Sequence, residues 1–439
     1  MAKTPIDFIV KPVSRFIEQE YTSGIVLFLS VVVALIWVNS PFETSYEHTW
    51  ETQLSIGYAG NLFDHPLHIW INDGLMAIFF FVIGLELKRE FMAGELSSLK
   101  KASLPIMAAL GGMVVPALIY VVFNAGLSSE TGWGIPMATD IAFALGLLSL
   151  SGKHIPGSIK VFLSALAVAD DLGAVLVIAF FYTAHISFSY LLLGGFFLII
   201  LIVGNSIGIR HTLFYLLIGI AVWACFLFSG VHATIAGVLV AFTIPARTRI
   251  NENEYVESIR KHTHLFERAI PLKGPLMTSD QHHIIEKIKR LSQDAETPLQ
   301  KIEYMLHPWV AFVIMPLFAV ANSGMHIGSN FFSALMNPVS MGVAAGLVAG
   351  KFVGVLGFTW IMVRLGFAEL PQLTTWKHIA GVAMLAGVGF TMSLFVTSLA
   401  FQDQQHIEAA KYGILLASLI SGAAGIFYLR ALAPAKSLV

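Results

Sequence analysis

The chain has 439 residues, of which 56% are hydrophobic and 12% are charged, and its formal net charge is −1. Soluble domains carry about 25% charged residues, so this composition excludes an ordinary soluble protein and predicts one that crosses a membrane many times. The near-zero net charge argues against a nucleic-acid partner, and a single cysteine, Cys225, excludes a disulfide framework within the chain.

The hydropathy pattern predicts an all-α polytopic membrane protein with about twelve transmembrane helices. Before them, residues 1–21 form an amphipathic stripe, which predicts a helix at the membrane interface. Spans one to eight lie in 22–246, a polar insert in 247–305, spans nine to twelve in 306–430, and a tail in 431–439. The expected spans are 22–40, 67–93, 103–125, 132–151, 157–184, 188–209, 212–229, 231–246, 308–326, 339–363, 376–401 and 407–430.

Lysine and arginine fall mainly on one side of these spans. The connector 41–66 contains four acidic residues and no Lys or Arg, whereas the insert 247–305 is rich in both. The positive-inside rule then places both termini and the insert in the cytoplasm. Only Lys411, beside the last outer connector, opposes this orientation.

Two polar segments lie outside the expected spans. Residues 45–58 alternate loosely between apolar and polar and precede Ala59-Gly60-Asn61, which predicts a short outer β-hairpin. The insert 247–305 predicts one or two cytosolic helices, broken at Pro271, Gly274 and Pro275.

Two spans carry residues that interrupt a helix inside the membrane. One combines Pro136, Thr139 and Asp140 within a short span, and the other has glycines at 381, 387 and 389. Each is the middle member of a three-span group, and the two groups, 103–184 and 339–430, start from opposite sides of the membrane. Interrupted spans at corresponding positions of inverted repeats indicate a transport site.

The apolar run 162–181 contains two adjacent carboxylates, Asp170 and Asp171. One aspartate at the centre of a membrane helix costs about 2.5–3.5 kcal/mol, so the pair must face a protein interior, a counter-charge or water. The pattern favours an ion site, and the alternative is a structural polar pair that joins two helices. Lys351 is a lone cation in the run 346–354, and its counter-charge has to come from another span.

The ends of the broken helices contribute to the charge balance. Two broken helices present two positive N-terminal ends and two negative C-terminal ends, each worth about half an elementary charge. Asp140 can offset the positive ends and Lys351 the negative ends. Asp170 and Asp171 are then an excess of negative charge, which either a monovalent cation or protons can neutralise.

At this point the sequence resembles the NhaA-type sodium/proton antiporter family, from about residue 14 to residue 430. Seven motifs carry the resemblance, in the order of the family. They are Phe79–Glu90 (FFFVIGLELKRE), Ala138–Gly146 (ATDIAFALG), Ala167–Ala174 (AVADDLGA), Ser229–Gly237 (SGVHATIAG), His307–Phe312 (HPWVAF), Gly350–Gly354 (GKFVG) and Gly387–Ser393 (GVGFTMS). The long insert before Glu303 departs from the shortest members of the family.

The resemblance implies that Asp170 and Asp171 bind Na⁺ or Li⁺ and release protons in exchange. It implies that Thr139 and Asp140 lie where the broken helices cross, and that Lys351 pairs with Asp170 or balances the helix ends. It further implies an acid of the outer funnel, Asp73, and five residues of the pH response, namely Glu86, Arg89, Glu90, His232 and Glu303. A role in the pH response is not the only interpretation of these five residues. The four others can equally be ordinary charged residues at the membrane face, and His232 can equally be a structural contact at a helix end.

The expected function is secondary active antiport of cytoplasmic Na⁺ or Li⁺ for external H⁺, by alternating access and with net charge movement. The protein would be no enzyme and need no cofactor. It would be a multi-pass protein of the bacterial inner membrane, in contact with the lipid bilayer and assembled as a homodimer through the outer hairpin. The alternatives are a sodium-coupled symporter of an organic anion on the same fold and a non-transporting membrane scaffold.

Overall fold

The structure is a computed structural model that describes residues 20–58, 61–152, 154–183, 186–269, 276–328 and 334–432. The expected N-terminal helix 1–21 and the breaks at 271–275 fall almost wholly outside these residues. Within them, nine helices are long and apolar enough to cross a membrane, or eleven if each of two bent helix pairs counts as one span. The shorter apolar helix α11 (Ala233–Thr243) occupies the place of the expected eighth span. The all-helical polytopic fold is therefore confirmed.

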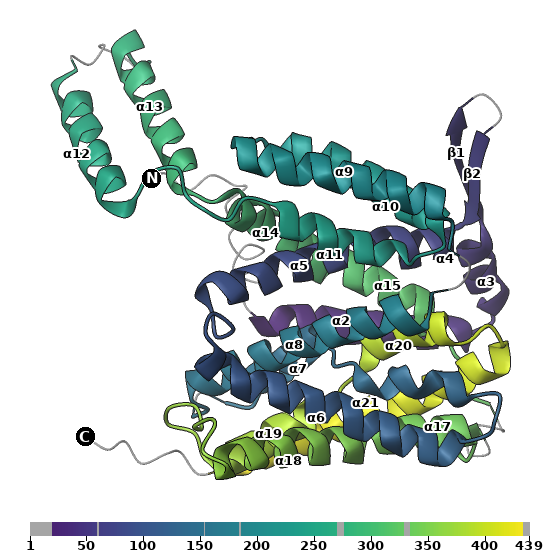
Figure 1. Cartoon of the computed structure of the whole chain (residues 1–439). Coiled ribbons are helices and arrows are strands. Elements are labelled where there is room, and N and C mark those ends of the chain that lie inside the picture. Colours follow the sequence, from purple (N-terminus) through teal and green to yellow (C-terminus); the bar gives the residue numbers. More distant parts are fainter. Residues whose placement is uncertain are drawn as a thin grey trace.

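The helices lie mostly side by side along a common direction, except for the short helix at 43–51, which is bent by 114° from the helix before it (Figure 1). Before the insert they are α2 (Glu20–Val38), α3 (Glu43–Glu51), α4 (Leu67–Ile69), η1 (Trp70–Leu75), α5 (Met76–Ala93), α6 (Leu99–Asn124), η2 (Glu130–Met137), α7 (Ile141–Leu150), α8 (Gly157–Phe181), α9 (Phe188–Ile207), α10 (Thr212–Ser229) and α11. After it they are α14 (Pro298–Trp309), η3 (Val310–Ile314), α15 (Met315–Asn322), α17 (Pro338–Ala345), η4 (Gly346–Gly350), α18 (Lys351–Arg364), α19 (Trp376–Leu385), α20 (Phe390–Ala400) and α21 (Gln404–Ala431).

The outer hairpin exists, but its limits differ from those expected. Strands β1 (Gln53–Tyr58) and β2 (Asn61–Pro66) pair antiparallel, whereas the whole segment from residue 45 to 51 belongs to the helix α3. Tyr46 and Trp50 are four residues apart, a spacing that suits one helix face as well as one strand face. In the structure both rings pack edge-on against Trp37 of α2, with centroids 5.4 and 6.4 Å away.

The ninth span begins earlier than its apolar run suggests. Helix α14 starts at Pro298, and the hydroxyl of Thr297 caps it by accepting the N–H of Gln300 at 3.1 Å. Threonine at the N-cap followed by proline is a strong helix start. The expectation of a span from 308 is therefore corrected to 298, and Glu303 lies within this helix.

The insert contains two helices, α12 (Glu252–Arg268) and α13 (Ser279–Ala295), which pack against each other. They project from one end of the bundle, and the β-hairpin stands at the other end (Figure 1). The backbone N–H groups of Arg249 and Ile250 donate to the carbonyl of Asp294 at 2.9 and 3.4 Å. The insert therefore leaves the bundle and returns to it at one point.

Close backbone contact between α6 and α18 joins the two expected repeats. A Cβ atom added at Gly354 would lie 2.1 Å from the carbonyl oxygen of Gly111, so neither position has room for a side chain. At Gly112 an added Cβ would lie 3.6 Å from Cδ of Lys351, which passes over this glycine. The small residues of α6 thus set the position of the buried lysine.

Gly354→Ala should lower the free energy of unfolding by about 1–3 kcal/mol, the usual cost of overpacking. Gly357→Ala, one turn farther along α18, is the matched control, because an added Cβ there meets no atom within 4 Å. It should be neutral or stabilising by about 0.5–1 kcal/mol, since alanine favours the helix. Thermal unfolding of the purified proteins in detergent measures both effects. Equal stability of the two variants would contradict the contact.

Candidate ion site

Two interrupted helices meet through the unwound segments between their halves. Helix η2 ends at Met137 and α7 starts at Ile141, while α19 ends at Leu385 and α20 starts at Phe390. Between them the N–H of Asp140 donates to the carbonyl of Val388 at 2.7 Å, and the hydroxyl of Thr139 donates to that of Ala386 at 2.9 Å. The crossing is thus held by hydrogen bonds between the two unwound segments, which satisfies backbone groups that lipid could not.

Asp140 caps both helices that begin at the crossing. Its Oδ1 accepts the N–H of Phe143 in α7 at 3.0 Å, and its Oδ2 accepts the N–H of Thr391 in α20 at 3.1 Å. The hydroxyl of Thr391 donates to the same Oδ2. One carboxylate, 1% exposed, therefore offsets two positive helix ends.

Lys351 forms a buried ion pair with Asp170. Its Nζ donates to Oδ2 of Asp170, and both side chains are fully buried. The carbonyls near the end of α19 are satisfied instead by Thr139 and Asp140. Of the two roles left open for the lysine, the structure therefore contains the pair with Asp170.

Asp171 stands next to this pair with neither carboxylate oxygen satisfied. Within the described residues, Oδ1 and Oδ2 of Asp171 and Oδ1 of Asp170 are buried and accept no hydrogen bond. Asp170, Asp140 and Glu86 are the acids near enough to act on it electrostatically. A buried carboxylate without a partner is expensive unless a proton or a cation neutralises it, so these three oxygens are the candidate ligands.

The remaining predicted residues form two groups. Glu86, Arg89 and Glu90 of α5 lie with Glu303 of α14, and Arg89 bonds to Glu303 and lies 3.4 Å from Glu90. Asp73 in η1 and His232 lie near each other elsewhere, and an imidazole nitrogen of His232 is 2.8 Å from the carbonyl of Tyr182. Sequence reasoning did not single out Thr391, although its place directly after a glycine break is a signal for it.

The broken helices and the buried charges between them define the class of protein. Inverted-repeat transporters bind ions where discontinuous helices cross near the bilayer midplane, with unwound backbone and buried carboxylates around the site. The fold and the site together are those of an ion-coupled secondary transporter.

Comparison with known proteins gives the family. The family model described as Na⁺/H⁺ antiporter 1 matches residues 14–429. The Na(+)/H(+) antiporter NhaA of Oleidesulfovibrio alaskensis is 48% identical over 432 residues, which cover 98% of this chain and 96% of the relative. That of Acidithiobacillus ferrooxidans is 48% identical over 423 residues, with 96% and 97% covered. The Na(+)/H(+) antiporter NhaA 2 of Syntrophotalea carbinolica is 46% identical over 421 residues, with 96% of each covered. The chain belongs to the Na⁺/H⁺ antiporter 1 family.

A double-mutant cycle tests the ion pair. Lys351→Met alone should destabilise the protein by about 3–5 kcal/mol, because it leaves Asp170 buried without a counter-charge. Lys351→Met combined with Asp170→Asn should be much less destabilising, since both charges are gone. The coupling energy, measured by unfolding both single variants and the double variant in detergent, should be about 3 kcal/mol, at the upper end of the usual range. Additive single and double changes would show that the two groups do not interact.

Proposed function

We propose that this protein exchanges Na⁺ or Li⁺ for H⁺ at Asp170 and Asp171. As a member of the family it is a multi-pass membrane antiporter and not an enzyme. The observation that carries the site assignment is the set of three buried carboxylate oxygens without partners, beside the crossing of the broken helices. A monovalent cation and protons can each neutralise this set, and they exclude each other because they use the same oxygens.

The two aspartates have different roles in this proposal. Asp171 is the principal ligand, since both of its oxygens are free in the described structure. Asp170 contributes its free Oδ1 and keeps Lys351 as the partner of Oδ2. When a cation draws Asp170 away, the ammonium of Lys351 is left buried without a counter-charge and can release a proton. The first proton thus comes from Asp171, and the second from Lys351, since Asp170 is already ionised in its pair with the ammonium.

Alternating access follows from the repeats. The groups 103–184 and 339–430 contain both broken helices and the four buried charged residues near their crossing, so they can move as one body relative to the other helices. Sodium then enters from the cytoplasm and leaves outside, and protons return in the opposite direction. Because two acids serve one monovalent ion, more than one proton is expected per sodium, and the exchange carries net charge.

The proposed orientation places both termini and the insert α12–α13 in the cytoplasm of a bacterial cell, with the β-hairpin outside. The positive-inside rule supports it, as does the position of the insert and the hairpin at opposite ends of the bundle (Figure 1). The hairpin also supports a homodimer. An isolated two-stranded sheet is marginal in water, and within the described residues each of its strands has one unpaired edge for a second copy.

The pH response is assigned to the group formed by Glu86, Arg89, Glu90 and Glu303, with His232 as a separate contributor. Glu303 has one oxygen bonded to Arg89 and a second oxygen, buried, that accepts no hydrogen bond in the described structure. A change in protonation there alters a contact between α5 and α14. Asp73, near His232, is proposed as the acid that sodium meets on the outer side.

The alternatives have less support. A scaffold gives no reason for four buried charges at the crossing. A symporter of an organic anion needs a cation left over to bind the anion, whereas Lys351 is already paired with Asp170. The relatives compared above are all named as Na⁺/H⁺ antiporters.

Asp171→Asn should abolish exchange, because an amide neither takes up a proton nor offers a negative charge to sodium. Sodium-induced proton movement in everted vesicles, followed with a pH-sensitive dye, should fall to the level of vesicles without the protein. Asp280→Asn, in the insert helix α13, is the matched control and should keep the full rate. Thermal stability should not fall in Asp171→Asn, since a buried charge is removed. Exchange at the full rate would overturn the assignment.

Removal of the insert separates transport from scaffolding. Deletion of residues 251–293, closed by a short Gly-Ser linker, is feasible because the backbones of Arg249 and Ile250 are hydrogen-bonded to Asp294. Exchange against pH in everted vesicles should persist, with a changed pH profile if the insert acts on the group around Glu303. A scaffold whose partner binds the insert would lose its function completely.

A further inference from the structure

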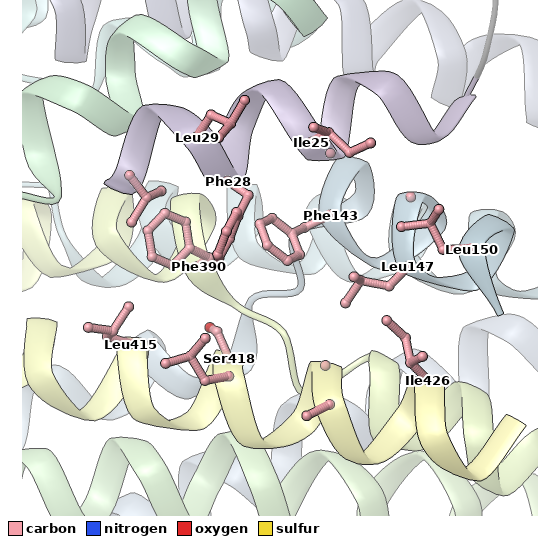
Figure 2. Close-up of a pocket in the computed structure, with 16 residues that line it drawn as sticks. Ile25, Phe28, Leu29, Phe143, Leu147, Leu150, Phe390, Leu415, Ser418 and Ile426 are labelled. Atoms are coloured by element: carbon pink, nitrogen blue, oxygen red, sulfur yellow. The ribbon is translucent and has the colours of Figure 1, made fainter. Parts of the chain in front are cut away.

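An apolar pocket opens beside the ion site, between α2 and the helices of the two repeats. Its volume is about 340 Å³, within the range of about 300–1,000 Å³ that is usual for sites of small ligands. Side chains from α2, α7 and α21 converge on it, together with Phe390 at the start of α20 (Figure 2). None of the charged residues discussed above lines it.

The lining selects for an apolar occupant. Ser418 is the one side chain with a polar atom among the residues that line the pocket, and its hydroxyl is buried without a partner in the described structure. A ligand with several polar atoms, such as an organic anion or a lipid headgroup, would bury them with almost nothing to bond. A saturated hydrocarbon chain meets no such cost.

The pocket is continuous with the surface that faces lipid. Phe28 and Leu29 of α2 are 43% and 53% exposed, and Leu419 of α21 is 52% exposed, although all three also line the pocket. In a membrane protein these outward faces border the hydrocarbon of the bilayer. The nearest molecules that can enter the opening are therefore lipid acyl chains.

The deep wall of the pocket belongs to the ion site. Phe143 and Phe390 pack with their centroids 6.2 Å apart, and Phe28 of α2 lies edge-on to Phe143 at 6.4 Å. The N–H of Phe143 is one of the donors to Asp140, and Phe390 is the first residue of α20. An occupant would therefore touch α2 on one side and the capped ends of both broken helices on the other.

We propose that this pocket is a specific binding site for one lipid acyl chain, which fills the gap between α2 and the broken helices. One hydrocarbon chain matches the apolar lining and the opening toward lipid, and the lining follows α21 from Leu415 to Ile426 (Figure 2). The backbones of α2 and α7 approach closely near Gly24 and Gly146. A Cβ atom added at Gly24 would lie 3.5 Å from Cα of Gly146. The chain therefore occupies the part of this interface that the helices leave open.

Photolabelling tests the site without use of transport, so its failure would leave the proposed function untouched. The probe is a phosphatidylglycerol with a diazirine in the middle of one acyl chain, mixed into vesicles that contain the full-length protein. Mass spectrometry should find label on the pocket residues of α2 and α21, saturating at about one chain per protein and displaced by unlabelled palmitate. Leu192 of α9, 80% exposed on the surface, should instead gain label in proportion to the probe.

A matched pair of variants supplies the second measurement. Ala423 and Ala424 are neighbouring exposed residues of α21, and only Ala423 lines the pocket. Ala423→Phe should weaken saturable labelling about tenfold, the effect of displacing roughly two methylenes from apolar contact. Ala424→Phe should leave it unchanged. Labelling of the pocket in the unmodified protein that rises linearly, as at Leu192, or that survives Ala423→Phe in a folded protein, would overturn the proposal.

Discussion

The charge balance at the crossing depends on Asp140. One carboxylate accepts hydrogen bonds from the first turns of both α7 and α20, and so neutralises two positive helix ends at once. The C-terminal ends are satisfied in a different way, by the hydroxyl of Thr139 and the backbone of Asp140. Lys351 is therefore not needed at the helix ends and is available to Asp170. Among Asp140, Asp170, Asp171 and Lys351, the negative charge without a partner is then that of Asp171.

Small residues make this arrangement possible. The backbones of α6 and α18 touch at Gly111 and Gly354, and Gly112 leaves the space through which Lys351 reaches Asp170. At the crossing itself, a Cβ atom at Gly389 would lie 2.9 Å from the carbonyl oxygen of Ala138. Within a bilayer, moving an apolar side chain from lipid into the protein yields little free energy, so close packing and hydrogen bonds have to hold the helices together. Glycine at these points allows both, because the backbones can approach closely enough to pack and to form hydrogen bonds.

Much of this architecture follows from local sequence patterns. Long apolar runs fix the spans, and glycine, proline and aspartate within them fix the breaks, because each is costly in an uninterrupted membrane helix. The charge count also anticipated Asp140 at the positive helix ends. Local patterns could not choose between the two partners of Lys351, because that choice depends on distances between separate spans. Thr391 was missed for the same reason, since its bond to Asp140 connects residues far apart in the chain.

The two boundary errors have a related cause. Tyr46 and Trp50 satisfy a strand period and a helix period equally well, and only their contact with Trp37 selects the helix. The start of α14 is not evident from hydropathy, because the charged residues Lys301 and Glu303 make this part of the membrane helix resemble the polar insert. In the structure Glu303 is buried and is paired with the partly exposed Arg89, so its charge does not exclude it from the bundle.

Under the proposed function, exchange requires that the protein alone leaves the carboxylates of the ion site without full compensation. If a second basic residue paired with Asp171, neither sodium nor a proton would gain by binding there. If Lys351 were absent, two uncompensated carboxylates would hold a cation or a proton too firmly to release it to the other side. The single lysine on Asp170, with Asp140 fully used by the helix ends, leaves one strong ligand and one that is shared. In the proposed mechanism, this difference between the two aspartates is what allows the site to carry either ion in turn.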